Sequence, residues 1–103
     1  MKKRLIYLTG FMASGKSTIG PILANTVGWN FYDLDKVIED ETNKSVRSIF
    51  EEFGENYFRD IETKTLTRLS ELQNHIISLG SRTVANNNNL EIIKSSGYLI
   101  YLE

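Results

Sequence analysis

The stretch GFMASGKST at residues 10–18 decides the fold, because it has the spacing of a phosphate-binding loop: two glycines separated by four residues and followed by Lys-Ser. Glycines let consecutive backbone N–H groups turn toward the phosphates, Lys16 reaches the outer phosphates, and the Ser17 hydroxyl ligates Mg²⁺. The pattern therefore predicts a nucleoside triphosphate site. Its predicted nucleotide-binding residues are Ala13, Ser14, Gly15, Lys16, Ser17 and Thr18.

The segments on either side of this loop have the patterns that the motif requires. Residues 4–9, RLIYLT, form a short apolar run with the β-branched and aromatic content of a buried strand. Apolar residues then recur at helical spacing over residues 19–26, and Gly28 stands where a helix would end. Strand, loop and helix follow in the expected order, and the helix N-terminus adds partial positive charge to the anion site. The alternative is a glycine-containing turn that matches the motif by chance.

Composition predicts one domain over residues 1–103 and excludes several classes of protein. The net charge of −1 gives no reason to expect a nucleic acid or an anionic membrane as partner. The absence of cysteine excludes disulfides and thiolate metal sites, and it fits a cytoplasmic location. The basic start MKKR precedes an apolar run that breaks at Gly10, which predicts a strand and not an export signal, and no stretch approaches the length of a membrane span.

The rest of the chain alternates between strand and helix patterns. Further strands are predicted at 29–33, 75–79 and 98–102. Helices are predicted at 34–53, ending at Gly54, at 58–72, and around 90–93. The asparagine tract at 86–89 is predicted to form a polar loop and a helix cap. This alternation predicts a three-layer α/β/α fold with a parallel sheet and right-handed crossovers, the fold of P-loop proteins, with the fourth strand last.

Two acidic residues follow the second predicted strand, in the place where parallel sheets bind their ligands. If the segment Asp33-Leu34-Asp35 is extended, both carboxylates point to the same side. We then expect Asp33 to lie near the Mg²⁺ ion and Asp35 near the hydroxyl that receives the phosphoryl group, which makes both catalytic candidates together with Lys16. The alternative is that these carboxylates cap the following helix.

Two further places carry candidate substrate-binding residues. The third predicted strand leads into Gly80-Ser81-Arg82, where the backbone N–H groups of Gly80 and Ser81 are candidates for binding an acceptor. Arg59 and Glu62 are three residues apart on the long helix, so Glu62 is placed to hold the guanidinium while it binds an anionic substrate. An exposed ion pair without a function is the alternative for these two residues.

Four blocks of the chain together resemble the shikimate kinase family: the loop at 10–18, FYDLD at 31–35, IFEEFGE at 49–55 and FRDIE at 58–62. The resemblance spans nearly the whole chain. It implies a P-loop kinase of the nucleoside monophosphate kinase type that uses ATP and Mg²⁺. Such kinases transfer the γ-phosphoryl group of ATP to the 3-hydroxyl of shikimate, on the pathway to chorismate and the aromatic amino acids.

The resemblance also implies a role for each acceptor-side residue. Asp33 would help the loop serine to bind Mg²⁺, and Asp35 would bind the shikimate hydroxyls and orient or deprotonate the acceptor. Arg59 would pair with the shikimate carboxylate, supported by Glu62. Phosphoryl transfer suits these roles, because it needs positioning and charge neutralisation more than covalent work by the protein.

The chain departs from the family in two ways. The family has three consecutive glycines where this sequence has Gly80-Ser81-Arg82, and the added side chains make any left-handed backbone there costly and put the acceptor pocket in doubt. The sequence also stops at Glu103, before the family's mobile lid with its arginine, its fifth strand, a further carboxylate-binding arginine and the adenine contacts. We therefore expect weak or absent turnover by this chain alone, and self-association through an exposed sheet edge.

Two other functions stay open from the sequence. A kinase-like module that binds nucleotide but has lost catalysis is favoured by Ser81, Arg82 and the early stop. A kinase for another small polyol, such as gluconate, would differ only in the acceptor pocket, and the pairing of two aspartates with Arg59 counts against it.

Overall fold

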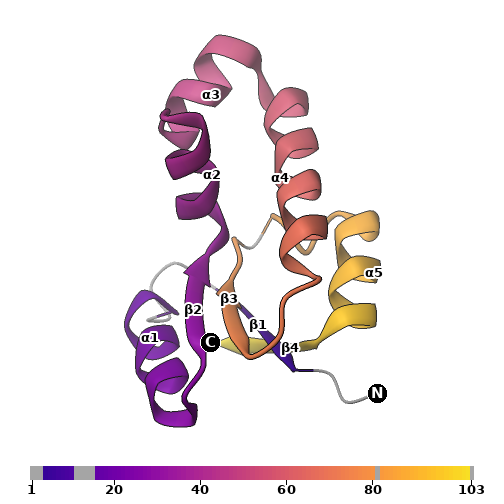
Figure 1. Cartoon of the computed structure of the whole chain (residues 1–103). Helices are drawn as coiled ribbons and strands as arrows, with labels where there is room; N and C mark the ends of the chain where they lie inside the picture. Colours follow the sequence, from indigo (N-terminus) through magenta and orange to yellow (C-terminus); the bar gives the residue numbers. More distant parts are fainter. Residues whose placement is uncertain (1–3, 11–15, 81, 103) are drawn as a thin grey trace.

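The computed structural model describes residues 4–10, 16–80 and 82–102 and confirms the predicted parallel α/β fold (Figure 1). Its four strands are β1 (Leu5–Gly10), β2 (Asn30–Asp33), β3 (His75–Ser78) and β4 (Tyr98–Leu102), in the sheet order β2-β3-β1-β4. Its helices are α1 (Lys16–Val27), α2 (Leu34–Thr42), α3 (Val46–Phe53), α4 (Glu55–Leu69) and α5 (Asn87–Ser96). No helix within these described ranges is both long and apolar enough to cross a membrane.

All neighbouring strands are parallel, and β1 lies in the middle of the sheet. Leu5 pairs with His75 of β3 on one side, and Ile6 pairs with Tyr98 of β4 on the other. Asn30 of β2 pairs with the same His75, so three strands begin level with one another. Their carboxyl ends therefore meet at one edge of the sheet, which is where a ligand is expected.

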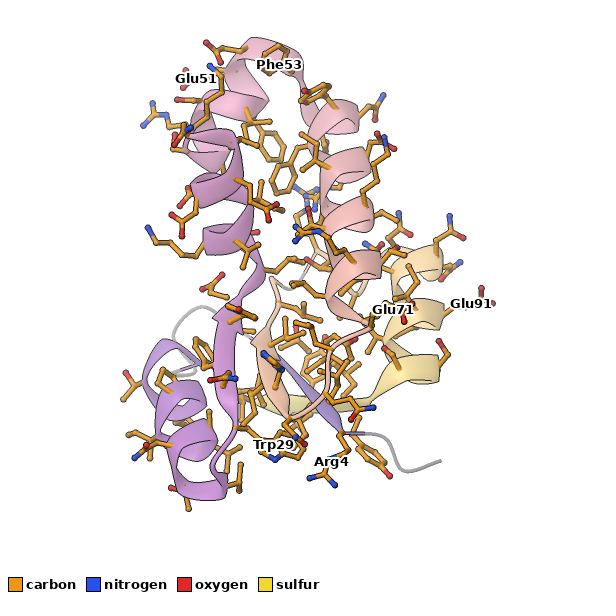
Figure 2. All side chains as sticks on the ribbon, in the orientation of Figure 1. Arg4, Trp29, Glu51, Phe53, Glu71 and Glu91 are labelled. Atoms are coloured by element: carbon orange, nitrogen blue, oxygen red, sulfur yellow. The ribbon has the colours of Figure 1, made fainter. Side chains whose placement is uncertain are left out.

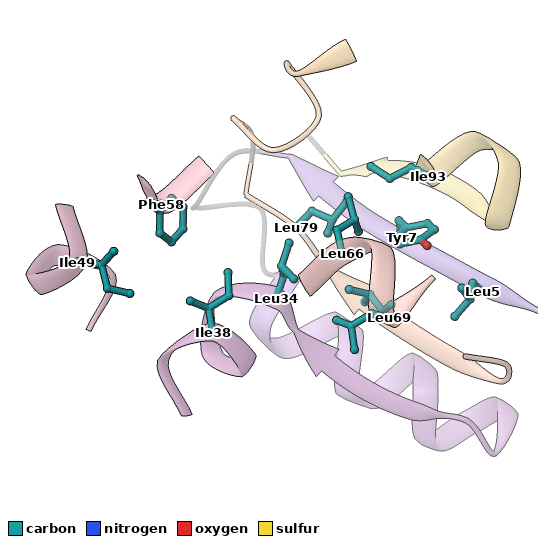
Figure 3. Packing of buried hydrophobic residues seen from close by; sticks show 11 residues of the cluster. Leu5, Tyr7, Leu34, Ile38, Ile49, Phe58, Leu66, Leu69, Leu79 and Ile93 are labelled. Carbon is teal, nitrogen blue, oxygen red and sulfur yellow. The ribbon is translucent and has the colours of Figure 1, made fainter. Parts of the chain in front are cut away.

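Helices cover both faces of the sheet, as a parallel sheet requires. Alternate residues of β1 point to opposite faces: Tyr7 belongs to the larger core under α4 and α5, and Leu8 belongs to a smaller core under α1. Figure 3 shows the larger cluster, which runs from the sheet into the helices packed against it. Its buried members are Leu5, Tyr7, Leu34, Ile38, Ile49, Phe58, Leu66, Leu69, Ile77, Leu79 and Ile93.

The prediction of a single helix over residues 34–53 is wrong, because two helices occupy this stretch. Asn43 adopts the left-handed conformation, with φ of 57°, and ends α2. The hydroxyl of Ser45 then accepts a hydrogen bond from the backbone N–H of Ser48 at 3.0 Å and begins α3 as its N-cap. The chain therefore turns between the two helices without a glycine or a proline.

The other predicted elements are confirmed with shifted ends. Helix α4 begins three residues before the predicted start and ends at Leu69, so Leu72 lies in the following turn, although it still packs against the core. The asparagine tract does cap α5: the Asn86 side chain accepts hydrogen bonds from the backbone N–H groups of Asn88 and Asn89. The rest of the tract forms the first turn of that helix, and Asn89 is fully buried there.

Helices α2, α3 and α4 form an arch that rises from the carboxyl edge of the sheet (Figure 1). Side chains fill the space between its two legs (Figure 2), and the rings of Phe50 and Phe58 meet there at 4.9 Å between centroids.

At the foot of the arch Gly10 ends β1 with φ of 145°, and a Cβ atom there would lie 2.0 Å from the carbonyl oxygen of Leu102. Only glycine fits, so β1 can end against β4 and lead into the loop.

Strand β4 lies at one edge of the sheet within the described residues, and Tyr101 on it is 62% exposed. We expect the chain to self-associate through this edge and the substitution Tyr101→Lys to weaken that association, because a charged lysine on an edge strand opposes pairing with another chain. Sedimentation equilibrium over a range of protein concentrations measures the effect. Tyr57→Lys is the matched control, since Tyr57 is also exposed but lies on α4; equal behaviour of both variants contradicts the prediction.

Candidate functional site

A cleft of about 480 Å³ opens at the carboxyl edge of the sheet, at the foot of the arch. The predicted site residues that line it are Asp33, Asp35, Arg59, Glu62 and Gly80. They come from β2, α2, α4 and the segment after β3, so the fold brings together residues that are up to 47 positions apart in the sequence, which is the separation of Asp33 and Gly80. Apolar side chains of Val46, Phe50 and Phe58 complete its wall.

Asp33 is the N-cap of α2. One of its carboxylate oxygens accepts hydrogen bonds from the backbone N–H groups of Asp35, at 3.0 Å, and Lys36, at 3.4 Å. The expected extended segment Asp33-Leu34-Asp35 is therefore wrong, because the helix begins at Leu34 and places Asp35 in its first turn. The capping alternative is correct for Asp33, yet both carboxylates line the cleft.

Asp35 carries the perturbed carboxyl group of the cleft. Burial, followed by the neighbouring charges of Asp33, Glu62 and Glu39, raises its pKa to about 6, against a lowering contribution from Arg59. Neutral pH therefore lies just above the pKa of this group, in the range where a carboxylate serves as an efficient general base. Its position at the cleft and its pKa both fit the role expected from the sequence.

Arg59 and Glu62 form a largely buried ion pair, so the alternative of an exposed pair is wrong. Arg59 Nη1 donates to Glu62 Oε1 at 2.9 Å, and the exposed fractions of the two side chains are 22% and 2%. Arg59 Nε also lies 3.5 Å from the Glu55 carboxylate. The guanidinium group stands 5.3 Å from the centre of the Phe58 ring and 5.8 Å from that of Phe50, both within the range of cation–π attraction. Two carboxylates and two rings thus fix the direction of this cation.

Two functional neighbours were missed from the sequence, and both lie after β3. The hydroxyl of Thr83 donates to Glu62 at 2.7 Å, and Arg82 lies on the rim of the cleft with its Nη1 atom 4.0 Å from Glu55. Thr83 has no local pattern that marks it, because its partner is 21 residues away. For Arg82 the sequence offers one indication, its place in Gly80-Ser81-Arg82 just after a predicted strand. The same indication made Gly80 and Ser81 candidates.

The segment after β3 does not need glycine for its backbone conformation at the positions described. Gly80 and Arg82 are not among the described residues with positive φ, and a Cβ atom on Gly80 would make only an ordinary contact, 3.7 Å from the Thr83 hydroxyl. The cost that a left-handed backbone would carry at a non-glycine residue therefore does not arise at Arg82. Ser81, which was also expected to bind substrate, lies outside the described residues.

The predicted nucleotide site is described only in part. Ala13, Ser14 and Gly15 lie outside the described residues, whereas Lys16, Ser17 and Thr18 form the first turn of α1. Helix α1 thus begins just after the carboxyl end of β1, which is the position of an anion-binding helix in this fold. The described residues hold no group of three or more His, Cys, Asp or Glu side chains that could bind a metal ion. A single carboxylate with a hydroxyl group and substrate phosphates suits Mg²⁺, and the expected role of Asp33 there stays a prediction.

Comparisons with known proteins agree in pointing to one family. The family model described as shikimate kinase matches residues 12–103. A shikimate kinase of Chloroherpeton thalassium is 47% identical over 102 residues, which are 99% of this chain and 54% of that protein. One of Chlorobium phaeobacteroides is 50% identical over 99 residues, covering 96% of this chain and 52% of that protein. The chain spans about half the length of these relatives.

Solved structures give the same result. The crystal structure of shikimate kinase from Aquifex aeolicus has a TM-score of 0.91 and 41% identity, and the match covers 96% of this chain and 59% of that one. The shikimate kinase from Acinetobacter baumannii, solved in complex with shikimate, has a TM-score of 0.92 and 36% identity, with 98% and 56% of the two chains covered. The four-stranded parallel sheet and its helices are thus an arrangement found in shikimate kinases.

We predict that Asp35→Asn raises the free energy of unfolding at pH 7.5. The pKa of Asp35 is about 6 in the folded protein, above the value of 3.8 for a free side chain, so the folded state holds the extra proton between these values. Stability contributed by this group is therefore present below about pH 4 and is lost as the pH rises through 6. Removing the charge recovers at most about 3 kcal/mol, and about 1–2 kcal/mol after allowance for the partial exposure of the carboxyl.

Urea denaturation at pH 7.5 and pH 4 measures this effect, and the gain is expected only at the higher pH. Asp40→Asn is the control on the same helix, because the Asp40 side chain is 66% exposed and pairs with the exposed Lys36 at 3.4 Å. We expect it to change stability by less than about 0.5 kcal/mol. An equal gain from Asp35→Asn at both pH values contradicts the assignment.

Proposed function

The chain belongs to the shikimate kinase family, and from this premise we propose that its cleft binds shikimate as the acceptor for the γ-phosphoryl group of ATP. The proposal rests on one observation: two complementary groups line the same cleft. They are the carboxyl group of Asp35, with a pKa of about 6, and the guanidinium group of Arg59, which is paired with the buried Glu62. A small polyhydroxylated acid needs both, one for its hydroxyl groups and one for its carboxylate. We place the reaction in aromatic amino acid synthesis and in the cytoplasm.

Arg59 is proposed to bind the carboxylate of shikimate. A guanidinium group has five N–H donors in a plane, so it can keep its contacts to Glu62 and Glu55 and still offer a donor pair to a ligand. The rings of Phe50 and Phe58 exclude water from one side of the cation, which strengthens the contact. Backbone N–H groups after β3, at Gly80 and Ser81, are proposed to contact the ring substituents.

Asp35 is proposed to orient the 3-hydroxyl and to accept its proton as the oxygen attacks phosphorus. The carboxylate form is the major form above pH 6, and a base of this pKa can both take and release a proton near neutrality. Asp33 lies one residue before α2, where it holds the helix start and with it the position of Asp35. The two aspartates therefore have different tasks.

Bound MgATP would supply the phosphoryl group and the charge that stabilises its transfer. The features that support a phosphate site are the glycine at the end of β1, which leaves no room for a Cβ atom, and the start of α1 directly after the loop. We propose that residues 13–18 bind the phosphates, with Lys16 acting on the outer ones. Ser17 and Asp33 are the proposed Mg²⁺-side residues.

A nucleotide-binding module without catalysis is the second candidate, and Arg82 favours it. This side chain is 75% exposed at the rim of the cleft, in the position where the family has a glycine, and it adds bulk and positive charge beside the acceptor. Such a module would respond to ADP and Mg²⁺ but not to shikimate.

Calorimetric titration with shikimate, with and without ADP and Mg²⁺, tests the proposal. We expect binding by the wild type and at least about tenfold weaker binding by Arg59→Ala, since a hydrogen-bonded charge pair contributes about 1.5–3 kcal/mol. Arg47→Ala is the control, because Arg47 is 89% exposed and pairs with Glu51 on α3. Binding of ADP with Mg²⁺ but not of shikimate supports the nucleotide-binding module. Binding of gluconate but not of shikimate supports the kinase for another polyol.

The pH dependence of ADP release in the presence of shikimate tests the role of Asp35. The deprotonated carboxyl is the active form, so kcat/KM should fall about tenfold per unit as the pH drops below 6 and should level off above 7. Asp35→Asn should lower phosphoryl transfer by about 10²–10⁴-fold and keep nucleotide binding. A flat profile between pH 5 and 7 rules Asp35 out as the base.

A further inference from the structure

We propose that Thr83 is a positioning residue for the anion-binding arginine: its hydroxyl holds Glu62, and Glu62 holds Arg59 in the cleft. This inference rests on the proposed function, since it concerns the cation that is to bind the acceptor carboxylate. Thr83 is 1% exposed and lies just beyond β3, whereas Glu62 and Arg59 lie on α4.

The Glu62 carboxylate is shared between two donors, one on each oxygen. Arg59 Nη1 donates to Oε1 at 2.9 Å, and Thr83 Oγ1 donates to Oε2 at 2.7 Å. Glu62 is 2% exposed, so water cannot readily replace either donor. Loss of the threonine hydroxyl leaves a buried, charged oxygen without its partner, and the carboxylate then gains by turning away from its present orientation.

Hydrogen bonds of its backbone hold Thr83 in place. Its N–H donates to the Gly80 carbonyl at 3.2 Å and closes the turn after β3, and its carbonyl accepts from Asn89 Nδ2 at 3.1 Å. Asn89 is fully buried on α5, and its side-chain oxygen accepts from the Thr63 hydroxyl of α4 at 2.7 Å. The hydroxyl of Thr83 is therefore held in place before it reaches Glu62, as a positioning residue requires.

Arg59 has a second carboxylate partner, Glu55, so the position of Glu62 decides which of the two carboxylates the guanidinium group lies closer to. Glu55 lies one turn before Arg59 on α4, its side chain is 50% exposed, and it is 3.5 Å from Arg59 Nε. If the Glu62 carboxylate turns away, the Arg59 guanidinium group interacts more with Glu55 and moves toward solvent. Thr83 thus keeps the cation at the buried end, where its interaction with an acceptor carboxylate is stronger.

The variant Thr83→Val tests the proposal, because it keeps the shape of the side chain and removes the hydroxyl. Titration with shikimate should give a Kd about tenfold higher, while the Kd for ADP with Mg²⁺ stays unchanged. Thr83→Ser restores the hydroxyl and should bring the Kd for shikimate to within about threefold of the wild type. The matched control is Thr9→Val: Thr9 is fully buried, but its hydroxyl has no hydrogen-bond partner among the described residues, so its loss should leave both Arg59 and the Kd for shikimate as they are.

A second measurement needs no ligand. Nitrogen-15 NMR follows the rotation of the Arg59 guanidinium group and the exchange of its Nε proton with solvent. Both should become faster in Thr83→Val, and in Thr83→Ala should the valine variant not fold, whereas the signals of Arg47 should not change. If wild-type protein binds no shikimate, the proposed function fails, but the NMR result still decides the role of Thr83. Unchanged Arg59 dynamics, or equal effects of Val and Ser, overturn the inference.

Discussion

The burial of the Glu62 carboxylate is the interaction on which the arrangement of the site depends. A charge with 2% exposure is costly to keep in an apolar interior unless both of its oxygens have strong donors. The donors come from different parts of the chain, Arg59 from one turn earlier on α4 and Thr83 from beyond β3. Satisfying this one charge therefore ties α4, one leg of the arch, to the segment that follows β3 at the carboxyl edge of the sheet.

The same charge shapes the acid–base chemistry of the cleft. Burial raises the pKa of Asp35, and the negative charges of Asp33, Glu62 and Glu39 add to the effect against the positive charge of Arg59. A carboxyl group in such surroundings weakens the folded state at neutral pH. Sites of this kind exchange some stability for reactivity, and burial of apolar side chains in the larger core, among them Leu34, Ile38 and Leu66, offsets the loss.

Sequence periodicity was sufficient for the type and order of the elements, because each strand or helix has its own local pattern, and the alternation of the two types indicates a parallel sheet. It was also sufficient for the Arg59–Glu62 pair, which lies within one turn of helix. It failed at residues 43–45, where the apolar faces of α2 and α3 continue in helical register and only the conformation of Asn43 and the cap by Ser45 separate them. It also failed at Asp33-Leu34-Asp35, since an extended strand end and a helix cap are both compatible with these residues. The bond from Thr83 to Glu62 spans 21 positions and follows only from the packing of α4 on the sheet.

Arg82, in the segment after β3, affects the site through its charge. Arg82 adopts a conformation that any residue can take, but its Nη1 atom lies 4.0 Å from Glu55 Oε2, the same oxygen that lies 3.5 Å from Arg59 Nε. Two guanidinium groups thus share one half-exposed carboxylate, and each weakens the hold of Glu55 on the other. Because Glu55 is divided between two cations in this way, the direction of Arg59 depends more on its buried pair with Glu62, whose other oxygen is bound by Thr83. The charge of Arg82 therefore makes the contact between Thr83 and Glu62 more important for the direction of Arg59.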